Sequence, residues 1–239
     1  MSRASRPRRV LITGAGRGLG LEFARQWLEG GHEVFALSRD PRSSKGLAGL
    51  AKAHPATLHT HACEVTSDAS VNEARRAVEA AWDRLDILVN NAAVYGGESH
   101  DVASLDLDEI RRTFEINTLA PLRMARAFQP LLRKGDHPRV IHVTSLMGSI
   151  DDNRSGGRYA YRVSKAALNM VSRNLAHDFK KDGILSVALH PGWVRTDMGG
   201  PDAPLGPEEA VASLIRTIAA LETAHNGGFY DREGRPQPW

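Results

Sequence analysis

Cysteine is almost absent from this sequence, since Cys63 is the single cysteine in 239 residues. One cysteine excludes an internal disulfide bond and favours a reducing compartment. No apolar run approaches the roughly 20 residues that a membrane-spanning helix needs. The first residues carry charge but lack the apolar stretch of a secretory signal peptide. We therefore predict a cytoplasmic protein that has no membrane contact.

The chain also carries only a small excess of positive charge, and this excess is concentrated at its start. The formal net charge is +3, and four arginines (Arg3, Arg6, Arg8 and Arg9) lie among the first nine residues. Nucleic-acid-binding proteins usually carry a basic face on the fold itself. We interpret residues 1–7 as a solvated basic arm on a single domain, residues 8–239, and expect no nucleic-acid partner. An RNA- or DNA-binding role of the arm remains the third functional alternative.

Apolar segments rich in β-formers alternate with helical patterns along the chain. The predicted strands are 9–13, 33–38, 57–61, 85–92, 139–145, 184–190 and 227–230. The predicted helices are 18–30, 68–82, 106–132, 158–181 and 207–221, with a weaker pattern over 45–53. This alternation predicts an α/β protein with a single-domain Rossmann fold, a doubly wound seven-stranded parallel sheet with helices on both faces. Ligands of such sheets bind outside the carboxyl ends of the strands.

The first predicted strand ends in the glycine-rich stretch Thr13-Gly14-Ala15-Gly16-Arg17-Gly18-Leu19-Gly20. Glycines permit a tight turn and a close approach of the backbone to a pyrophosphate. The helix that follows offers free N–H groups and the positive end of its dipole to phosphate. Because this pattern lies between a strand and a helix, it predicts a dinucleotide site.

The end of the second predicted strand indicates which dinucleotide binds. A carboxylate there would bind the ribose hydroxyl of NAD(H), whereas the sequence places Ser38 and Arg39 there, with Arg17 expected nearby. Guanidinium groups suit a phosphate. Asp40 lies one step further along and can serve as a turn residue before Pro41. NADP(H) is therefore favoured over NAD(H).

Further motifs follow the later strands. Asn90-Asn91-Ala92-Ala93 ends the fourth strand, Thr144-Ser145 ends the fifth, and Pro191-Gly192 follows the sixth. The segment YAYRVSK adds Tyr161 and Lys165. In this order, the motifs resemble those of the short-chain dehydrogenase/reductase family over nearly the whole chain. The stretches DDNRSGGRYAYRVSKAALNM and LHPGWVRTDMGG resemble the subgroup of C-factor and sniffer-type carbonyl reductases.

The resemblance implies a catalytic tetrad of Asn117, Ser145, Tyr161 and Lys165. Tyr161 and Lys165 are four residues apart and share one face of a helix. Tyr159 lies roughly 200° around that helix and should face away. We therefore predict that Tyr161, and not Tyr159, is the acid. Lys165 would stabilise its phenolate and also bind the nicotinamide ribose, while Ser145 would hydrogen-bond the substrate oxygen.

The motifs and the resemblance together predict the cofactor contacts: Gly14, Gly16, Arg17, Gly18, Leu19, Gly20, Ser38, Arg39, Glu64, Val65, Asn91, Ala92, Ala93, Tyr161, Lys165, Pro191, Gly192, Val194 and Thr196. Thr196 matches the family position that holds the nicotinamide carboxamide. Ala93 replaces the usual glycine, which an alanine can do only if its φ angle is negative. Glu64 replaces the usual aspartate and leaves the adenine contact open.

These residues predict an NADP(H)-dependent oxidoreductase of the carbonyl reductase type, acting on a small carbonyl or alcohol without a metal. We expect the loop 148–158 and Trp193 to form much of the substrate wall. Relatives pair through the helices matching 106–132 and 158–181, so the resemblance implies a homodimer or homotetramer. The alternative is a regulatory or signalling protein that binds NADP(H) with little turnover. A complete tetrad argues against it, since a pure binder does not need all four residues.

Overall fold

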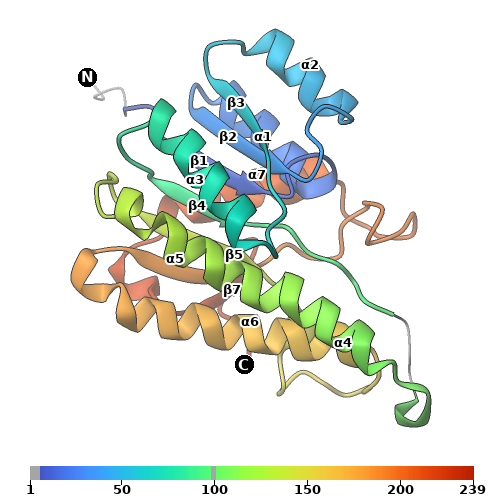
Figure 1. The fold of residues 1–239 in the computed structure, drawn as a ribbon. Helices are drawn as coiled ribbons and strands as arrows, with labels where there is room; N and C mark the ends of the chain where they lie inside the picture. Colours follow the sequence, from blue (N-terminus) through green and yellow to red (C-terminus); the bar gives the residue numbers. More distant parts are fainter. Residues whose placement is uncertain (1–5, 98–100) are drawn as a thin grey trace.

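The computed structural model describes residues 6–97 and 101–239, so residues 1–5 of the predicted arm lie outside the described residues. Seven strands form one parallel sheet in the order β3-β2-β1-β4-β5-β6-β7 (Figure 1). The strands are β1 (Arg9–Thr13), β2 (Glu33–Ser38), β3 (Leu58–Ala62), β4 (Ile87–Asn90), β5 (Arg139–Val143), β6 (Leu185–His190) and β7 (Phe229–Asp231). The predicted doubly wound sheet is confirmed.

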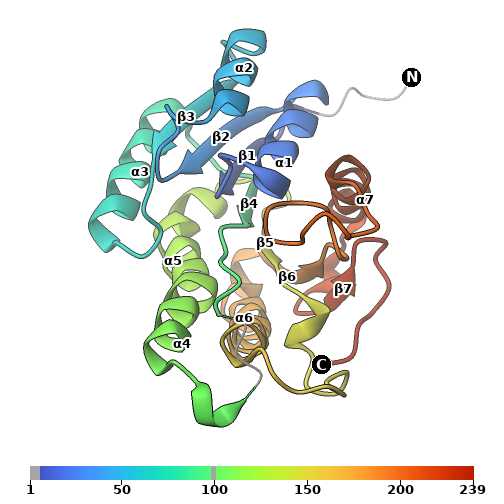
Figure 2. The same ribbon diagram turned by 90° about the vertical axis from the view of Figure 1, so that its right-hand side faces the viewer.

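Helices cover both faces of the sheet. They are α1 (Gly18–Glu29), α2 (Lys45–Ala53), α3 (Asp68–Ala81), α4 (Leu107–Phe114), α5 (Ala120–Leu132), α6 (Tyr159–Asp178) and α7 (Pro207–Ala220). Figure 2 shows α1 and α7 on one side of the sheet and α3 and α5 on the other. Side chains alternate along a strand, so Val10 and Ile12 join the core beneath α1 and α7, and Leu11 joins the opposite core.

The predicted helix 106–132 is interrupted. A π turn, Glu115–Leu119, separates α4 from α5, and the Ala120 N–H bonds back to the Glu115 carbonyl. Pro121 lies in the first turn of α5 and has no N–H to donate to the Asn117 carbonyl four residues earlier. A local change of hydrogen-bond pattern accommodates that missing donor. The π turn buries Asn117 and Thr118.

The strand order creates the crevice that a ligand needs. The chain runs from β1 through β2 to β3 on one side, then returns to place β4 on the other side of β1. Such a reversal opens a space at the carboxyl ends of the two central strands. There the Asn91 side chain donates to the Thr13 carbonyl at 2.9 Å, and the Ala92 N–H donates to the Thr13 hydroxyl at 3.0 Å. The glycine-rich turn and the fourth strand end are thus joined.

Two of the N-terminal arginines belong to the fold. Arg8 pairs with Asp136 at 3.6 Å, and Arg9 lies 3.6 Å from Glu33. The charges of Arg8 and Arg9 are therefore balanced by nearby acids. Within the described ranges, no helix is both long and apolar enough to cross a membrane.

Candidate active site

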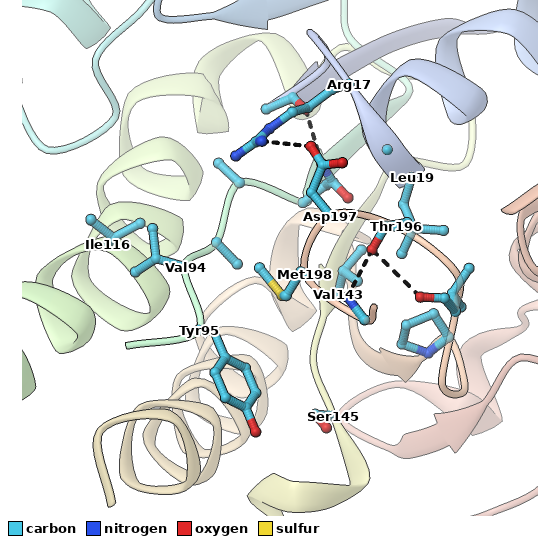
Figure 3. Close-up of a pocket in the computed structure, with 18 of the residues that line it drawn as sticks. Arg17, Leu19, Val94, Tyr95, Ile116, Val143, Ser145, Thr196, Asp197 and Met198 are labelled. Carbon is cyan, nitrogen blue, oxygen red and sulfur yellow. Dashed lines mark hydrogen bonds and ion pairs between the residues drawn. The ribbon is translucent and has the colours of Figure 1, made fainter. Parts of the chain in front are cut away.

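One cavity of about 1550 Å³ lies at the carboxyl ends of the strands (Figure 3). It brings together nearly all the predicted site residues. Those that line it are Gly14, Gly16, Arg17, Gly18, Leu19, Ser38, Arg39, Glu64, Val65, Asn91, Ala92, Ala93, Ser145, Tyr161, Lys165, Pro191, Gly192, Val194 and Thr196. Gly20 and Asn117 do not line it. Both lie one layer behind the surface of the cavity.

The glycine-rich turn is shaped by close backbone packing. Gly14 has a φ of +66°, and a Cβ there would lie 2.9 Å from the Ala92 Cα. A Cβ on Gly20 would collide with the Gly14 carbonyl, so Gly20 permits close packing of α1, and its contact with a cofactor stays a prediction. At the start of α1, Arg17 provides no side-chain cap and the first turn has no acidic residue. The N–H groups of this turn therefore lack a side-chain acceptor, as an anion site requires.

The end of β2 presents a buried hydroxyl and an exposed guanidinium to the cavity. Ser38 Oγ is buried and has no hydrogen-bond partner among the residues that the structure describes. Arg39 beside it is exposed. The Asp40 carboxylate accepts hydrogen bonds from the N–H groups of Arg42 at 3.1 Å and Ser43 at 3.3 Å. Asp40 thus serves as a turn residue, as the sequence predicts.

Arg17 extends across the cavity to the loop after β6. Its Nη1 lies 2.6 Å from an Asp197 carboxylate oxygen, and both side chains are largely exposed (Figure 3). Thr196, beside Asp197, accepts a hydrogen bond from the Gly199 N–H at 3.2 Å. The glycine-rich turn and this loop therefore form opposite walls of one end of the cavity.

Asn117 supports the cavity wall from behind. Its side chain accepts from the Val94 N–H at 2.9 Å and donates to the Val94 carbonyl at 2.8 Å. It also donates to the Ser164 hydroxyl at 3.0 Å, which links the π turn to α6. Ala93, next to Val94, does not have a positive φ angle, so alanine fits there without strain.

Glu64 is engaged close to its own position in the chain. Its carboxylate accepts from the Thr66 N–H at 3.2 Å and from the Thr66 hydroxyl at 2.9 Å. The Glu64 N–H donates to Ser70 Oγ at 3.0 Å. Glu64 therefore fixes the turn after β3 while it lines the cavity.

The first turns of α6 carry the tyrosine and lysine. Tyr161 is 8% exposed and lines the cavity, whereas Tyr159 is 36% exposed and does not. Lys165 Nζ donates to the Val143 carbonyl at 2.9 Å and lies 5.6 Å from the centre of the Tyr161 ring. Tyr161, which was predicted to share a helix face with Lys165, is therefore the tyrosine that reaches the cavity.

Ser145 and Gly148 follow β5 and adjoin this helix. Ser145 accepts a hydrogen bond from the Met147 N–H at 3.1 Å, which leaves its own hydrogen free for another acceptor. A Cβ on Gly148 would lie 2.7 Å from the backbone carbonyl carbon of Lys165. Only a residue without a side chain lets α6 pack this closely against the end of β5.

Burial governs the protonation of the tyrosine and lysine. Removal from water raises the pKa of Tyr161 to about 12, although the Ser145 hydroxyl, hydrogen bonded to it, acts in the opposite direction. Burial also lowers the pKa of Lys165 to about 7. In the protein's own environment, burial thus outweighs the expected stabilisation of the phenolate by Lys165. Tyr161 consequently keeps its proton at neutral pH.

Several cavity residues were not predicted from the sequence. They are Asp40, Ser43, Ser44, Cys63, Val94, Tyr95, Ile116, Val143, Thr144, Leu146, Met147, His190, Asp197, Met198, Gly199 and Gly200, whereas Arg158 and Trp193 were expected as substrate wall. From the loop expected to form much of that wall, Arg158 lines the cavity and residues 148–157 do not. The sequence could have singled out Arg158 within this loop, because it directly precedes the helix that carries Tyr161.

The fold and the site define a Rossmann-type protein in which a glycine-rich turn and a tyrosine–lysine pair line one crevice at the carboxyl ends of the strands. The family model for short chain dehydrogenase matches residues 8–204. The chain belongs to this family, the short-chain dehydrogenases/reductases. The resemblance seen in the sequence motifs is thereby confirmed.

Two curated relatives illustrate the range of the family. The chain is 48% identical over 155 residues to C-signal from Myxococcus xanthus, covering 65% of this chain and 93% of that protein. It is 38% identical over 234 residues to 1-hydroxy-2-glutathionyl-2-methyl-3-butene dehydrogenase from Rhodococcus sp. (strain AD45). That match covers 96% of this chain and 99% of the relative.

Solved structures share the whole fold. Carbonyl reductase Sniffer of D. melanogaster superposes with a TM-score of 0.93 at 32% identity, covering 98% of this chain and 100% of that one. An NADPH-bound carbonyl reductase from chicken fatty liver superposes with a TM-score of 0.92 at 34% identity, with the same coverage. The expected likeness to sniffer-type carbonyl reductases is confirmed.

The buried ammonium generates a prediction for stability. The pKa of Lys165 is about 7 in the folded protein against 10.5 in its reference state. Between these values the unfolded chain binds more protons, so the stability of the folded protein rises with pH. We expect Lys165→Met, measured by urea unfolding without nucleotide, to exceed the wild type in free energy of unfolding at pH 6. This advantage should shrink above pH 7 by up to ~1.4 kcal/mol per pH unit. A constant difference from pH 6 to 9 would contradict the assigned pKa.

Proposed function

We propose that this protein is an NADPH-dependent reductase of carbonyl compounds, with Tyr161 as the proton donor. The observation that carries the proposal is the meeting of Tyr161, Ser145 and Lys165 in one cavity with the glycine-rich turn. The likeness to an NADPH-bound carbonyl reductase supports the cofactor and the reaction class.

The described residues fit a dinucleotide with a 2′-phosphate. The uncapped N-terminus of α1 suits the pyrophosphate, and the close packing at Gly14 leaves its backbone without a side chain in the way. The buried Ser38 hydroxyl has no partner among the described residues and, with Arg39, suits the 2′-phosphate. Asp40, which would repel that phosphate, is held in its own turn. When bound, NADPH supplies the hydride.

The side chains around the substrate carbonyl have complementary roles. Tyr161, whose pKa of about 12 keeps it protonated, donates the proton to the carbonyl oxygen. Ser145, which is hydrogen bonded to Tyr161 when no substrate is bound, turns its hydroxyl to the same oxygen and stabilises the negative charge that develops there. Lys165, 5.6 Å from the Tyr161 ring, offsets the charge of the phenolate that remains.

Removal of the Tyr161 hydroxyl tests the proposed acid. We expect Tyr161→Phe to lower kcat for reduction by roughly 10²–10⁴-fold, because a positioned acid contributes that much. NADPH binding, followed by nucleotide fluorescence, should stay within a few fold. The matched control is Tyr159→Phe, which changes a tyrosine outside the cavity and should retain most activity. The reverse ranking of the two variants would show that Tyr161 is not the acid.

Cofactor choice is tested at the end of β2. Arg39→Ala should raise KM for NADPH roughly ten- to a hundred-fold, the value of one hydrogen bond to a charged group. KM for NADH should barely change, since NADH has no 2′-phosphate. Arg42→Ala removes an exposed arginine that does not line the cavity and serves as the control. Equal losses with NADPH and NADH would exclude Arg39 as the reader of the phosphate.

A regulatory or signalling protein that binds NADP(H) remains the second candidate. The 48% identity to C-signal over 155 residues favours it. In that case NADPH would bind, but turnover would stay negligible over a broad panel of aldehydes and ketones. A regulatory role that needs only NADP(H) binding would then survive Tyr161→Phe, whereas a role that needs reduction would be lost, which separates the two candidates.

We further propose a homodimer or homotetramer that pairs through α5 and α6. Apolar side chains remain exposed on these helices: Leu122 at 39%, Val163 at 47% and Met170 at 61%. Met170→Glu combined with Val163→Glu should yield monomers in light scattering at micromolar concentration, because two buried charges would oppose association. Val102→Glu, at an exposed residue outside these helices, is the control. A monomeric wild type would refute the pairing.

A further inference from the structure

A cation–tyrosine pair lies beside the proposed acid, on the substrate side of the cavity. Arg158 donates a hydrogen bond from Nη1 to the Tyr95 hydroxyl, and its guanidinium carbon lies 5.3 Å from the centre of the Tyr95 ring. The Tyr95 ring is in turn 4.8 Å from the Tyr161 ring, centre to centre. All three residues line the cavity. Tyr95 and Ser145 lie toward the same end, away from Arg17 (Figure 3).

The backbone around Arg158 is unusual. Gly156 and Gly157 have φ angles of +61° and +64°, and Arg158 follows with +49°. A positive φ is uncommon for a residue with a side chain and disfavoured energetically. Arg158 then leads directly into α6 at Tyr159. Its position is therefore fixed by the start of the same helix that positions Tyr161.

The hydrogen-bonding capacity of the pair is only partly used. A guanidinium has five N–H donors, and the structure gives Arg158 one side-chain hydrogen bond, to Tyr95. The Tyr95 oxygen accepts that bond, so its own O–H remains available as a donor. Within residues 6–97 and 101–239, Arg158 forms no ion pair. Two adjacent sets of donors thus face the cavity without an acceptor from the described part of the chain.

Among the described residues, the carboxylates that line the cavity are engaged elsewhere. Asp197 pairs with Arg17, Glu64 binds the Thr66 backbone and hydroxyl, and Asp40 caps its own turn. The first turn of α6 has no acidic residue, and its dipole adds positive potential near Arg158. This region therefore favours a negatively charged ligand.

We propose that Arg158 and Tyr95 bind a carboxylate on the substrate. The inference rests on the proposed reductase function and names its substrate class: carbonyl compounds that carry a carboxylate a few bonds from the reacting carbon. The guanidinium fork and the phenolic O–H together match the acceptor oxygens of one carboxylate. Because the Tyr95 ring packs against Tyr161, the bound carboxylate holds the carbonyl close to Tyr161 and Ser145.

The test compares two aldehydes of the same shape. 4-Carboxybenzaldehyde carries the carboxylate, and methyl 4-formylbenzoate carries a neutral ester, which withdraws more electron density and makes its carbonyl intrinsically the more reactive, so a preference for the acid must come from the protein. We expect wild-type kcat/KM to be roughly ten- to a hundred-fold higher for the acid, as one charged hydrogen bond allows. Arg158→Gln should remove this preference while leaving reduction of the ester within a few fold. Tyr95→Phe should weaken the preference less than Arg158→Gln does.

Arg154→Gln is the matched control, because Arg154 is an exposed arginine of the same loop and does not line the cavity. It should keep the preference for the acid. Equal kcat/KM for acid and ester in the wild type, or equal losses on both in Arg158→Gln, would overturn the proposal.

A binding measurement separates failure of this inference from failure of the reductase function. Calorimetry in the presence of NADPH compares 4-(hydroxymethyl)benzoate with 4-(hydroxymethyl)benzamide, because an alcohol and a reduced nicotinamide cannot exchange a hydride and the heat reports binding alone. Tighter binding of the benzoate that is lost in Arg158→Gln would support the carboxylate site even if neither aldehyde is reduced. Equal binding of the two compounds would refute the site whatever the activity.

Discussion

A buried ammonium bonded to a backbone carbonyl is the interaction on which the rest of the site depends. Lys165 Nζ is removed from water and donates to the Val143 carbonyl at the end of β5. A buried charge is costly unless it is hydrogen bonded, so this contact fixes the first turns of α6 against the sheet. Tyr161, one turn earlier on the same face, is thereby held in the cavity, and the Asn117–Ser164 bond braces the helix from the other side.

Much of the fold was predictable because its signals are local. The strands are near-continuous apolar segments, and a buried parallel sheet requires that pattern. Within 106–132, Pro121 predicts a disturbance of the helix because it has no N–H for the Asn117 carbonyl. The π turn that accommodates it was not predictable, because a pattern of side chains does not report which backbone groups bond. The division into residues 1–7 and 8–239, the cytoplasmic location and the absence of a nucleic-acid role remain predictions.

The site was predictable where its residues share one strand end or one helix face. Tyr161 was distinguished from Tyr159 by the family resemblance, with which the helix geometry agrees, and of the two the structure places only Tyr161 in the cavity. The contact between Arg158 and Tyr95 spans 63 residues and depends on how two loops meet. The raised pKa of Tyr161 depends on burial, which no short motif reveals. The steric need for glycine at position 20 depends on how α1 packs against the Gly14 carbonyl, which the motif alone does not show.

Gly148 fixes the distance between the end of β5 and the helix α6. With no side chain between the end of β5 and the backbone of Lys165, the separation of helix and sheet is set by backbone contact. The start of α6, with Tyr161 and Lys165, therefore keeps a set distance from the end of β5. The cavity can change shape more readily at the side that carries Tyr95, Arg158 and Trp193, where side chains can be replaced without moving this helix.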